Sequence, residues 1–450
     1  MTRRSPPSDD APTHGAVVPP LLADTRSSSN RLPSNRPPLE LHIPLPGARP
    51  GEVPDFSGLD IPAAGATPRP DIDASAFAMR DLAYALVRVL DEDGRAVGPW
   101  NPDLPPVLLL RMLRAMVLTR AFDDRMFRAQ RQGKTSFYMK SLGEEAVAVA
   151  AALALDDDDM LFPSYRQQGL LIAREWSIED MMNQIFSNRA DRLKGRQMPI
   201  MYSVRDKNFF SISGNLTTQY PQAVGWAMAS AARGDTRIAA AWCGEGSTAE
   251  GDFHSACTFA SVYRAPVILN IVNNQWAISS FAGFAGGEAT TFAARGVGYG
   301  IASLRVDGND PLAVYAATHW AADRARANHG PTLIEHFTYR AEGHSTSDDP
   351  AAYRSAGEAG AWPLGDPVAR LRDHLVALGE WDADRHVQME REVVEQVRAA
   401  QKAAEANGIL GHGLHQPMET MFEDVFAEMP WHLKEQRQQM QDERKAAGLE

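Results

Sequence analysis

Apolar positions change their spacing along the chain, and each change predicts a different kind of element. From about residue 76 they follow a helical period, with Leu82, Leu86 and Val89 followed by further apolar positions between residues 108 and 122. Between about residues 155 and 340, short runs rich in Val, Ile and Ala replace this pattern. Four of these runs are expected to be strands, at 237–243, 266–272, 301–306 and 331–337.

The expected strands alternate with helix-like stretches, which is typical of βαβ units. The alternation predicts an α/β fold class with a doubly wound, mostly parallel sheet and helical N- and C-terminal extensions. Residues 1–75, which hold half of the 30 prolines, are expected to form an extended or disordered arm. An α/β domain is expected over 76–365 and a charged helical region over 366–450, where the polar stretch 434–445 predicts a solvated helix.

Composition narrows the function classes. The 450 residues are 44% hydrophobic and can bury a large core, and the net charge of −12 disfavours a broad surface for nucleic acid. Since no apolar run of membrane-spanning length occurs, neither a membrane span nor a signal peptide is expected. The only two cysteines, Cys243 and Cys257, fit a reducing compartment, and a cytoplasmic location is expected.

Polar residues follow the first two expected strands. Glu245 and Asn274 stand at their carboxyl ends, which lie side by side in a parallel sheet, so the two side chains are expected to converge on one cation. An oxygen-only pair suits Mg²⁺ or Ca²⁺ rather than zinc. Gly244 and Gly246 allow an anion to approach the backbone, and a helix starting near Ser247 would point its N–H groups at that anion. These features predict a metal-bridged diphosphate site.

A dinucleotide fingerprint is the alternative interpretation, because Gly244-x-Gly246-x-x-Ala249 also follows a strand and opens a helix. The acidic Glu245 would repel a pyrophosphate unless a cation lay between them. The region near Arg264 also lacks the carboxylate that binds a ribose. The metal-bridged site is therefore favoured over nicotinamide binding.

Several motifs together resemble a known family. Gly244-Glu-Gly246, followed after the next strand by Asn273-Asn274, is similar to the signature of thiamine-diphosphate enzymes, whose usual form is Gly-Asp-Gly. More specific segments resemble alpha subunits of branched-chain 2-oxo acid dehydrogenases, also called 2-oxoisovalerate dehydrogenases, over roughly residues 100 to 430. They are 137–139, 143–145, 194–199, 305–310, 344–349 and 353–355. The stretch Lys194-Gly-Arg-Gln-Met-Pro199 favours this family over the similar pyruvate dehydrogenase alpha subunits.

The resemblance implies a sheet of the thiamine-diphosphate-binding type, with thiamine diphosphate and Mg²⁺ as cofactors. Side-chain oxygens of Glu245 and Asn274 and the carbonyl of Trp276 would bind Mg²⁺. Val272 stands where some relatives carry an arginine. Positions that would contact the cofactor are Tyr165, Arg166, Gly214, Leu216, Gly246, Ser247 and His344.

The resemblance also implies specific roles for Leu216, His344 and Arg166 and a site for a monovalent cation. Leu216 would be the apolar wedge that holds the cofactor bent, and His344 would be catalytic, as a diphosphate donor or in acid-base steps. A lone arginine such as Arg166 is usually a surface residue and a loop histidine is usually solvated, so both roles depend on their motifs. A monovalent cation such as K⁺ would be bound by Ser213, Asn215, Thr218 and Gln219.

The implied reaction is oxidative decarboxylation of 3-methyl-2-oxobutanoate and related branched 2-oxo acids, with acyl transfer to a lipoyl group. In the resembled family a separate beta subunit provides the glutamate that starts cofactor deprotonation. An α2β2 heterotetramer and a lipoyl acyltransferase core are therefore the expected partners. Two alternatives stay open: a pyruvate or acetoin dehydrogenase alpha subunit, and a non-catalytic relative that binds a partner through an inherited fold.

Overall fold

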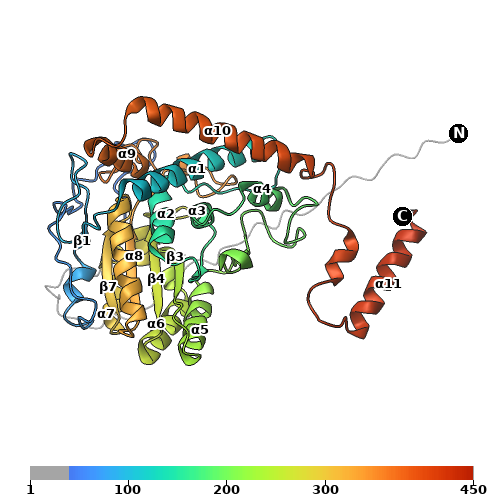
Figure 1. Ribbon diagram of the computed structural model, residues 1–450, viewed down its shortest axis with the longest axis horizontal. Coiled ribbons are helices and arrows are strands. Elements are labelled where there is room, and N and C mark those ends of the chain that lie inside the picture. The colour runs from blue at the N-terminus through green and yellow to red at the C-terminus, as the bar shows by residue number, and fades with distance from the viewer. Residues whose placement is uncertain (1–39, 449–450) are drawn as a thin grey trace, which may run out of the picture. The chain divides into compact units, whose positions relative to one another are not determined.

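The computed structural model describes residues 40–448 of the chain (Figure 1). The chain divides into two units, Met1–Ile43 and Pro44–Glu450. Of the first unit only residues 40–43 are described, and they contain no helix or strand. Residues 1–39 of the predicted extended or disordered arm therefore lie outside the described range.

A six-stranded sheet forms the centre of the second unit (Figure 1). Its order is β1-β7-β8-β4-β3-β2, and every neighbouring pair is parallel. A separate antiparallel hairpin joins β5 (Trp276–Ala277) to β6 (Ser280–Phe281). The strands of the main sheet are β1 (Leu86–Val87), β2 (Met160–Phe162), β3 (Ala239–Gly244), β4 (Val267–Asn273), β7 (Ala302–Asp307) and β8 (Thr332–Phe337). The predicted fold class is confirmed, and β3, β4, β7 and β8 confirm the four predicted strands.

Alternate residues of the central strands belong to two different cores, because successive side chains point to opposite faces of a sheet. Ala240 and Trp242 pack in one core with α1 (Pro106–Arg131), α2 (Glu145–Ala154) and α8 (Pro311–Arg326). Ala241 and Leu269 pack in the other with α5 (Gln219–Ala232) and α6 (Gly251–Tyr263). Because both faces are covered, the strands are apolar runs rather than alternating apolar and polar sequences.

The remaining described helices are shorter or lie toward the C-terminus. Within the domain they are α3 (Gln168–Ala173), α4 (Ile178–Phe186) and α7 (Ala294–Gly298). Beyond it follow α9 (Pro367–Ala377), α10 (Ala383–Ala406), which runs beside α1 in Figure 1, and α11 (Trp431–Ala446). No residue of α11 is buried, which agrees with the solvated helix predicted there. Among residues 40–448, no helix is both long and apolar enough to cross a bilayer.

The helical pattern predicted through Leu82, Leu86 and Val89 is wrong. The segment Arg80–Ala83 forms a single 3-10 turn, and β1 follows it as an edge strand beside β7. The N–H groups of Val89 and Leu90 then donate to Asp310 Oδ2, at 2.7 and 2.6 Å. Tertiary partners thus satisfy backbone groups that a helix would have paired internally.

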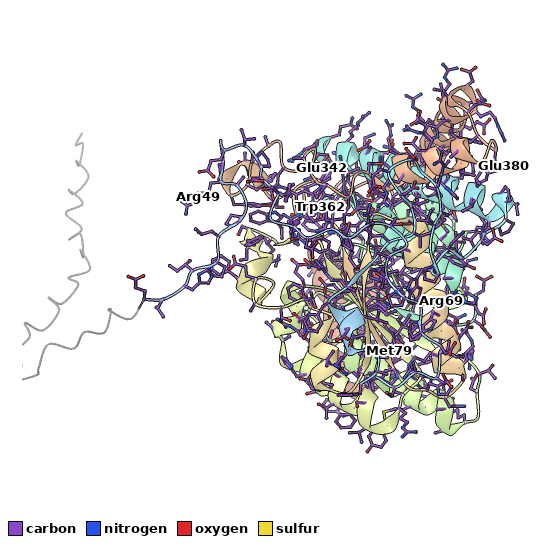
Figure 2. The ribbon with its side chains drawn as sticks, turned by 90° about the vertical axis from the view of Figure 1, so that its left-hand side faces the viewer. Arg49, Arg69, Met79, Glu342, Trp362 and Glu380 are labelled. Atoms are coloured by element: carbon purple, nitrogen blue, oxygen red, sulfur yellow. The ribbon has the colours of Figure 1, made fainter. Side chains whose placement is uncertain are left out.

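Residues 44–75 contain no helix or strand, yet they make specific contacts with the domain. The ring of Phe56 lies edge-on to Trp362, with ring centroids 5.3 Å apart. The Ser355 hydroxyl donates to the carbonyl of Glu52 at 2.7 Å, and the Trp100 indole donates to the carbonyl of Pro68 at 3.1 Å. The segment can be followed in Figure 2, where Arg49 and Arg69 lie on it and the labelled Trp362 is the ring that Phe56 contacts. The predicted boundary near residue 75 stays a prediction.

We expect Phe56→Ala to lower the free energy of unfolding by about 2 kcal/mol, since it removes a half-buried ring and its edge-on contact with Trp362. Urea denaturation of the full chain measures this change. Phe77→Ala is the control, because Phe77 is 76% exposed and should change stability by less than about 0.5 kcal/mol. Equal effects of the two changes would show that residues 44–75 do not support the domain.

Candidate functional site

A cavity of about 180 Å³ lies at the carboxyl ends of the central strands. Its walls come from the turn after β3, the loop after β4, and the loops that follow β2 and β8. Because parallel strands end at one edge of the sheet, segments far apart in sequence meet there. The predicted residues that line it are Tyr165, Arg166, Leu216, Glu245, Gly246, Ser247, Asn274, Trp276 and His344.

Glu245 is 1% exposed and stands in the turn after β3. Its Oε2 accepts a hydrogen bond from the backbone N–H of Asn274 at 3.4 Å, whereas Oε1 is buried without a hydrogen-bond partner among the described residues. Burial raises the pKa of Glu245 to about 7, and the neighbouring carboxyl of Glu144 acts in the same direction. A buried carboxylate oxygen without a partner is costly unless a cation or donor reaches it. The arrangement fits a metal ion bound at Oε1.

The other two predicted metal ligands are oriented by hydrogen bonds. The Asn274 side chain donates through Nδ2 to Glu144 Oε1 at 2.8 Å and accepts at Oδ1 from the N–H of Trp276 at 3.3 Å. The carbonyl of Trp276 accepts from the Arg340 guanidinium at 2.9 Å. Each of these oxygens keeps a second lone pair, so both fit a cation that prefers hard oxygen ligands, as Mg²⁺ does.

Arg166 is 4% exposed and is held against the loop after β8. Its guanidinium donates to the carbonyl of Lys140 and, at 3.0 Å, to the carbonyl of His344. It also lies 3.3 Å from His344 Nδ1. These contacts fix a planar cation in the cavity wall, where it can meet phosphate oxygens.

The His344 ring lies edge-on to Tyr165, with ring centroids 5.7 Å apart. Burial, together with the positive charges of Arg166 and Arg340, lowers the pKa of His344 to about 3. The imidazole is therefore neutral near pH 7. Since Nδ1 faces the Arg166 guanidinium, which can only donate, the ring proton is assigned to Nε2.

The segment that precedes α5 contributes less to the cavity than predicted. Leu216 lines the cavity and is 45% exposed, whereas Gly214 is not among the lining residues. Three hydrogen bonds involve the residues that the resemblance assigns to a monovalent cation. These are Asn215 N–H to Ser213 Oγ at 3.1 Å, Thr218 Oγ1 to the Asn215 carbonyl at 3.2 Å, and Gln219 Nε2 to the Trp242 carbonyl at 2.5 Å.

The helix expected to start near Ser247 starts later. Gly246–Ala249 forms a 3-10 turn, and α6 begins at Gly251. Glu250 between them has an extended backbone, with φ −73° and ψ 147°, and this interrupts the helix. Gly246 and Ser247 therefore line the cavity from a tight turn rather than from the end of α6.

Two charged residues near the cavity, Glu144 and Arg340, have no role predicted from the sequence. Glu144 lines the cavity and is 3% exposed, and burial raises its pKa to about 7. Arg340 is 1% exposed, and its positive charge opposes the burial effect on both Glu144 and Glu245. Val272, the position at which the resemblance implies an arginine in some relatives, also lines the cavity. In the sequence, Glu144 stands in the family-like segment 143–145, next to Glu145 at the start of α2, but neither feature indicates its role.

Comparisons with known proteins show the family to which the chain belongs. Residues 113–412 match the family described as dehydrogenase E1 component, and residues 37–77 match the family described as 2-oxoisovalerate dehydrogenase E1 alpha subunit N terminal. The chain is 61% identical to a 2-oxoisovalerate dehydrogenase subunit alpha of Pseudomonas aeruginosa, covering 90% of this chain and 99% of the relative. It is 38% identical to the mitochondrial 2-oxoisovalerate dehydrogenase subunit alpha of Homo sapiens, covering 88% and 90%.

Proposed function

This chain belongs to the dehydrogenase E1 component family, and we propose that it is the alpha subunit of a 2-oxoisovalerate dehydrogenase. The single observation that carries the proposal is the buried Glu245 Oε1 without a partner, next to Asn274 at the carboxyl ends of adjacent strands. The relatives' names and the match of residues 37–77 support branched 2-oxo acids, such as 3-methyl-2-oxobutanoate, as substrates.

The family uses thiamine diphosphate, and the lining residues fit its metal-bound diphosphate end. Mg²⁺ would be held by Glu245, Asn274 and the carbonyl of Trp276. When bound, thiamine diphosphate supplies the nucleophilic carbon and the electron sink that decarboxylation of a 2-oxo acid requires. The diphosphate would meet Arg166, Tyr165, Gly246, Ser247 and His344.

The neutral imidazole of His344 can donate a hydrogen bond from Nε2 without adding charge to the cavity. Leu216 presents an apolar side chain to the cofactor from the cavity wall, with Gly214 in the same turn. The assignment of K⁺ to Ser213, Asn215, Thr218 and Gln219 remains part of the proposal.

A beta subunit would complete the site in an α2β2 assembly, which passes its acyl product to a lipoyl acyltransferase core. Residues 40–448 contain one parallel sheet, and they hold no second α/β domain that could bind the pyrimidine end of the cofactor. The cavity is correspondingly small, and its lining residues are suited to the diphosphate end. The proposal therefore assigns deprotonation of the cofactor to a residue of the partner.

Binding of Mg²⁺ with thiamine diphosphate should strengthen as the pH rises from 6 to 8. The pKa of Glu245 is raised to about 7, so a cation that binds its carboxylate must displace a proton at lower pH, and affinity should fall about tenfold per pH unit below that value. In the unliganded chain the pH dependence has the opposite sign. Glu144 and Glu245 stabilise the fold when protonated, and that contribution is lost as the pH rises from about 4.5 through about 7. Calorimetry in buffers of different ionisation enthalpy measures the released protons, and pH-independent affinity would contradict the expectation.

The proposed function is tested by CO₂ release from 3-methyl-2-oxobutanoate and from pyruvate, with Mg²⁺ and thiamine diphosphate. The chain is assayed alone and together with its candidate beta subunit. Turnover that needs the partner and favours the branched substrate supports the proposal. Preference for pyruvate would move the chain to the pyruvate or acetoin dehydrogenase alternative, and no turnover in an assembled complex would favour a non-catalytic relative.

A further inference from the structure

We propose that Glu144 is a positioning residue that fixes both the metal-binding amide of Asn274 and the diphosphate-binding guanidinium of Arg166. The inference deepens the proposed function and rests on it. Glu144 does not itself bind the metal in this scheme. It selects the orientation in which its two neighbours can do so.

The contacts of Glu144 reach both neighbours. Its Oε1 accepts from Asn274 Nδ2 at 2.8 Å and lies 3.5 Å from Arg166 Nε. The side chain is 3% exposed and lines the cavity, so solvent does not compete for these contacts. Asn274 and Arg166 come from loops after different strands, and Glu144 comes from the start of α2. One carboxylate thus joins three separate segments of the chain.

The contact with Asn274 decides which way its amide points. An asparagine amide can rotate to exchange its oxygen and nitrogen, and only the oxygen can bind a cation. A carboxylate can only accept, so Glu144 holds the nitrogen on its own side. The oxygen is then left on the side of the Trp276 N–H, which donates to it at 3.3 Å. Both contacts favour the same orientation, which also matches the ligand role proposed for Asn274.

The Glu144 side chain has no role in its own helix that would explain its burial. Glu144 is the N-cap residue of α2, and its side chain makes no capping hydrogen bond. The adjacent Glu145 differs in this respect, because it accepts from the Gly143 N–H at 2.9 Å and pairs with Arg120 at 2.8 Å. Glu145 is fully buried and does not line the cavity. Comparing variants of Glu144 with variants of Glu145 therefore distinguishes a positioning role from the simple burial of a carboxyl group.

The test compares Glu144→Leu, Glu144→Gln and the control Glu145→Gln in the complex assembled with the beta subunit. Binding of Mg²⁺ with thiamine diphosphate is measured by calorimetry, and the melting temperature of each complex is recorded. We expect Glu144→Leu to weaken metal-dependent binding by about 10- to 100-fold, as loss of a residue that orients a ligand does. Glu144→Gln keeps an acceptor for Asn274 and should restore most of the affinity. Glu145→Gln should lower the melting temperature while binding stays within about twofold of the unaltered complex.

Three results would overturn the inference. The first is unaltered affinity in Glu144→Leu, and the second is an equal loss of affinity in Glu145→Gln. The third is a loss in Glu144→Gln as large as in Glu144→Leu at an unchanged melting temperature. The unaltered complex distinguishes the two levels of proposal. If it binds no Mg²⁺ with thiamine diphosphate, the proposed function fails as well, whereas failure limited to the Glu144 variants leaves that function standing.

Discussion

Changing Glu245 to Gln is expected to weaken Mg²⁺-dependent binding of thiamine diphosphate by at least about 100-fold, since even residues that only orient a metal ligand contribute 10- to 100-fold. The change keeps the size of the side chain and removes the charge that would face the cation at Oε1. Turnover of the assembled complex at fixed Mg²⁺ should fall by a similar or larger factor. Titration of Mg²⁺ against both binding and turnover measures the effect.

The same substitution should act in the opposite direction on the unliganded chain. At pH 8 an ionised Glu245 is buried without a partner for Oε1, and a neutral amide costs less to bury. The melting temperature of the variant should therefore exceed that of the unaltered chain. Asp159→Asn is the control. Asp159 is equally buried, but it precedes β2, at the amino end of that strand, and does not line the cavity. An unchanged Mg²⁺ titration in Glu245→Gln would remove the metal site from this cavity.

Arg166→Met should cost both cofactor affinity and stability. Two charge-assisted hydrogen bonds to a diphosphate are together worth about 3 kcal/mol, so affinity should fall about 100-fold. The free energy of unfolding should fall by about 3 kcal/mol, because the carbonyls of Lys140 and His344 lose their donor and Glu144 loses its cation. Removing the charge should also raise the pKa of His344 toward its ordinary value. The three effects are measured by calorimetry, urea denaturation and the pH profile of turnover.

Arg174→Met is the matched control for Arg166→Met. Arg174 is also 4% exposed and also donates to backbone carbonyls, those of Lys207 at 2.6 Å and Asp159 at 3.0 Å. It does not line the cavity. The control should lose comparable stability and keep its affinity for the cofactor. If both variants lose affinity equally, Arg166 acts through the fold rather than through the diphosphate.

The parts of the fold that the sequence predicts well are those buried on both faces. The strands β3 and β4 are short, mainly apolar runs that alternate with helical stretches, and the polar residues after them meet as expected. The edge strand β1 has only two residues, Leu86 and Val87. Its neighbours Leu82 and Val89 happen to repeat at helical spacing, so the pattern was misleading. Pairing with β7 decided the structure, and that contact is not visible in a local pattern.

The sequence predicts the site residues that follow consecutive strands. It does not predict those that only tertiary contacts bring to the site. Glu245 and Asn274 follow consecutive strands, so topology alone brings them together. Glu144 lines the cavity from the start of α2, and Arg340, in the loop after β8, donates to the carbonyl of the lining residue Trp276. Their effect on the pKa of Glu245 depends on burial and on distances that no sequence spacing contains. The start of α6 was misplaced for a similar reason, since one extended residue interrupts an otherwise helical stretch.

The position of β1 at the edge of the sheet also has a consequence for how the chain matures on the ribosome. Leu86 pairs with Arg305, so the edge strand must wait until β7 has left the exit tunnel. At about 5 to 20 residues per second, that interval is roughly 10 to 40 seconds. During this time β1 lacks its strand partner. In residues 1–75 one position in five is a proline without an N–H group, which disfavours wrong strand pairing by this stretch over such a delay.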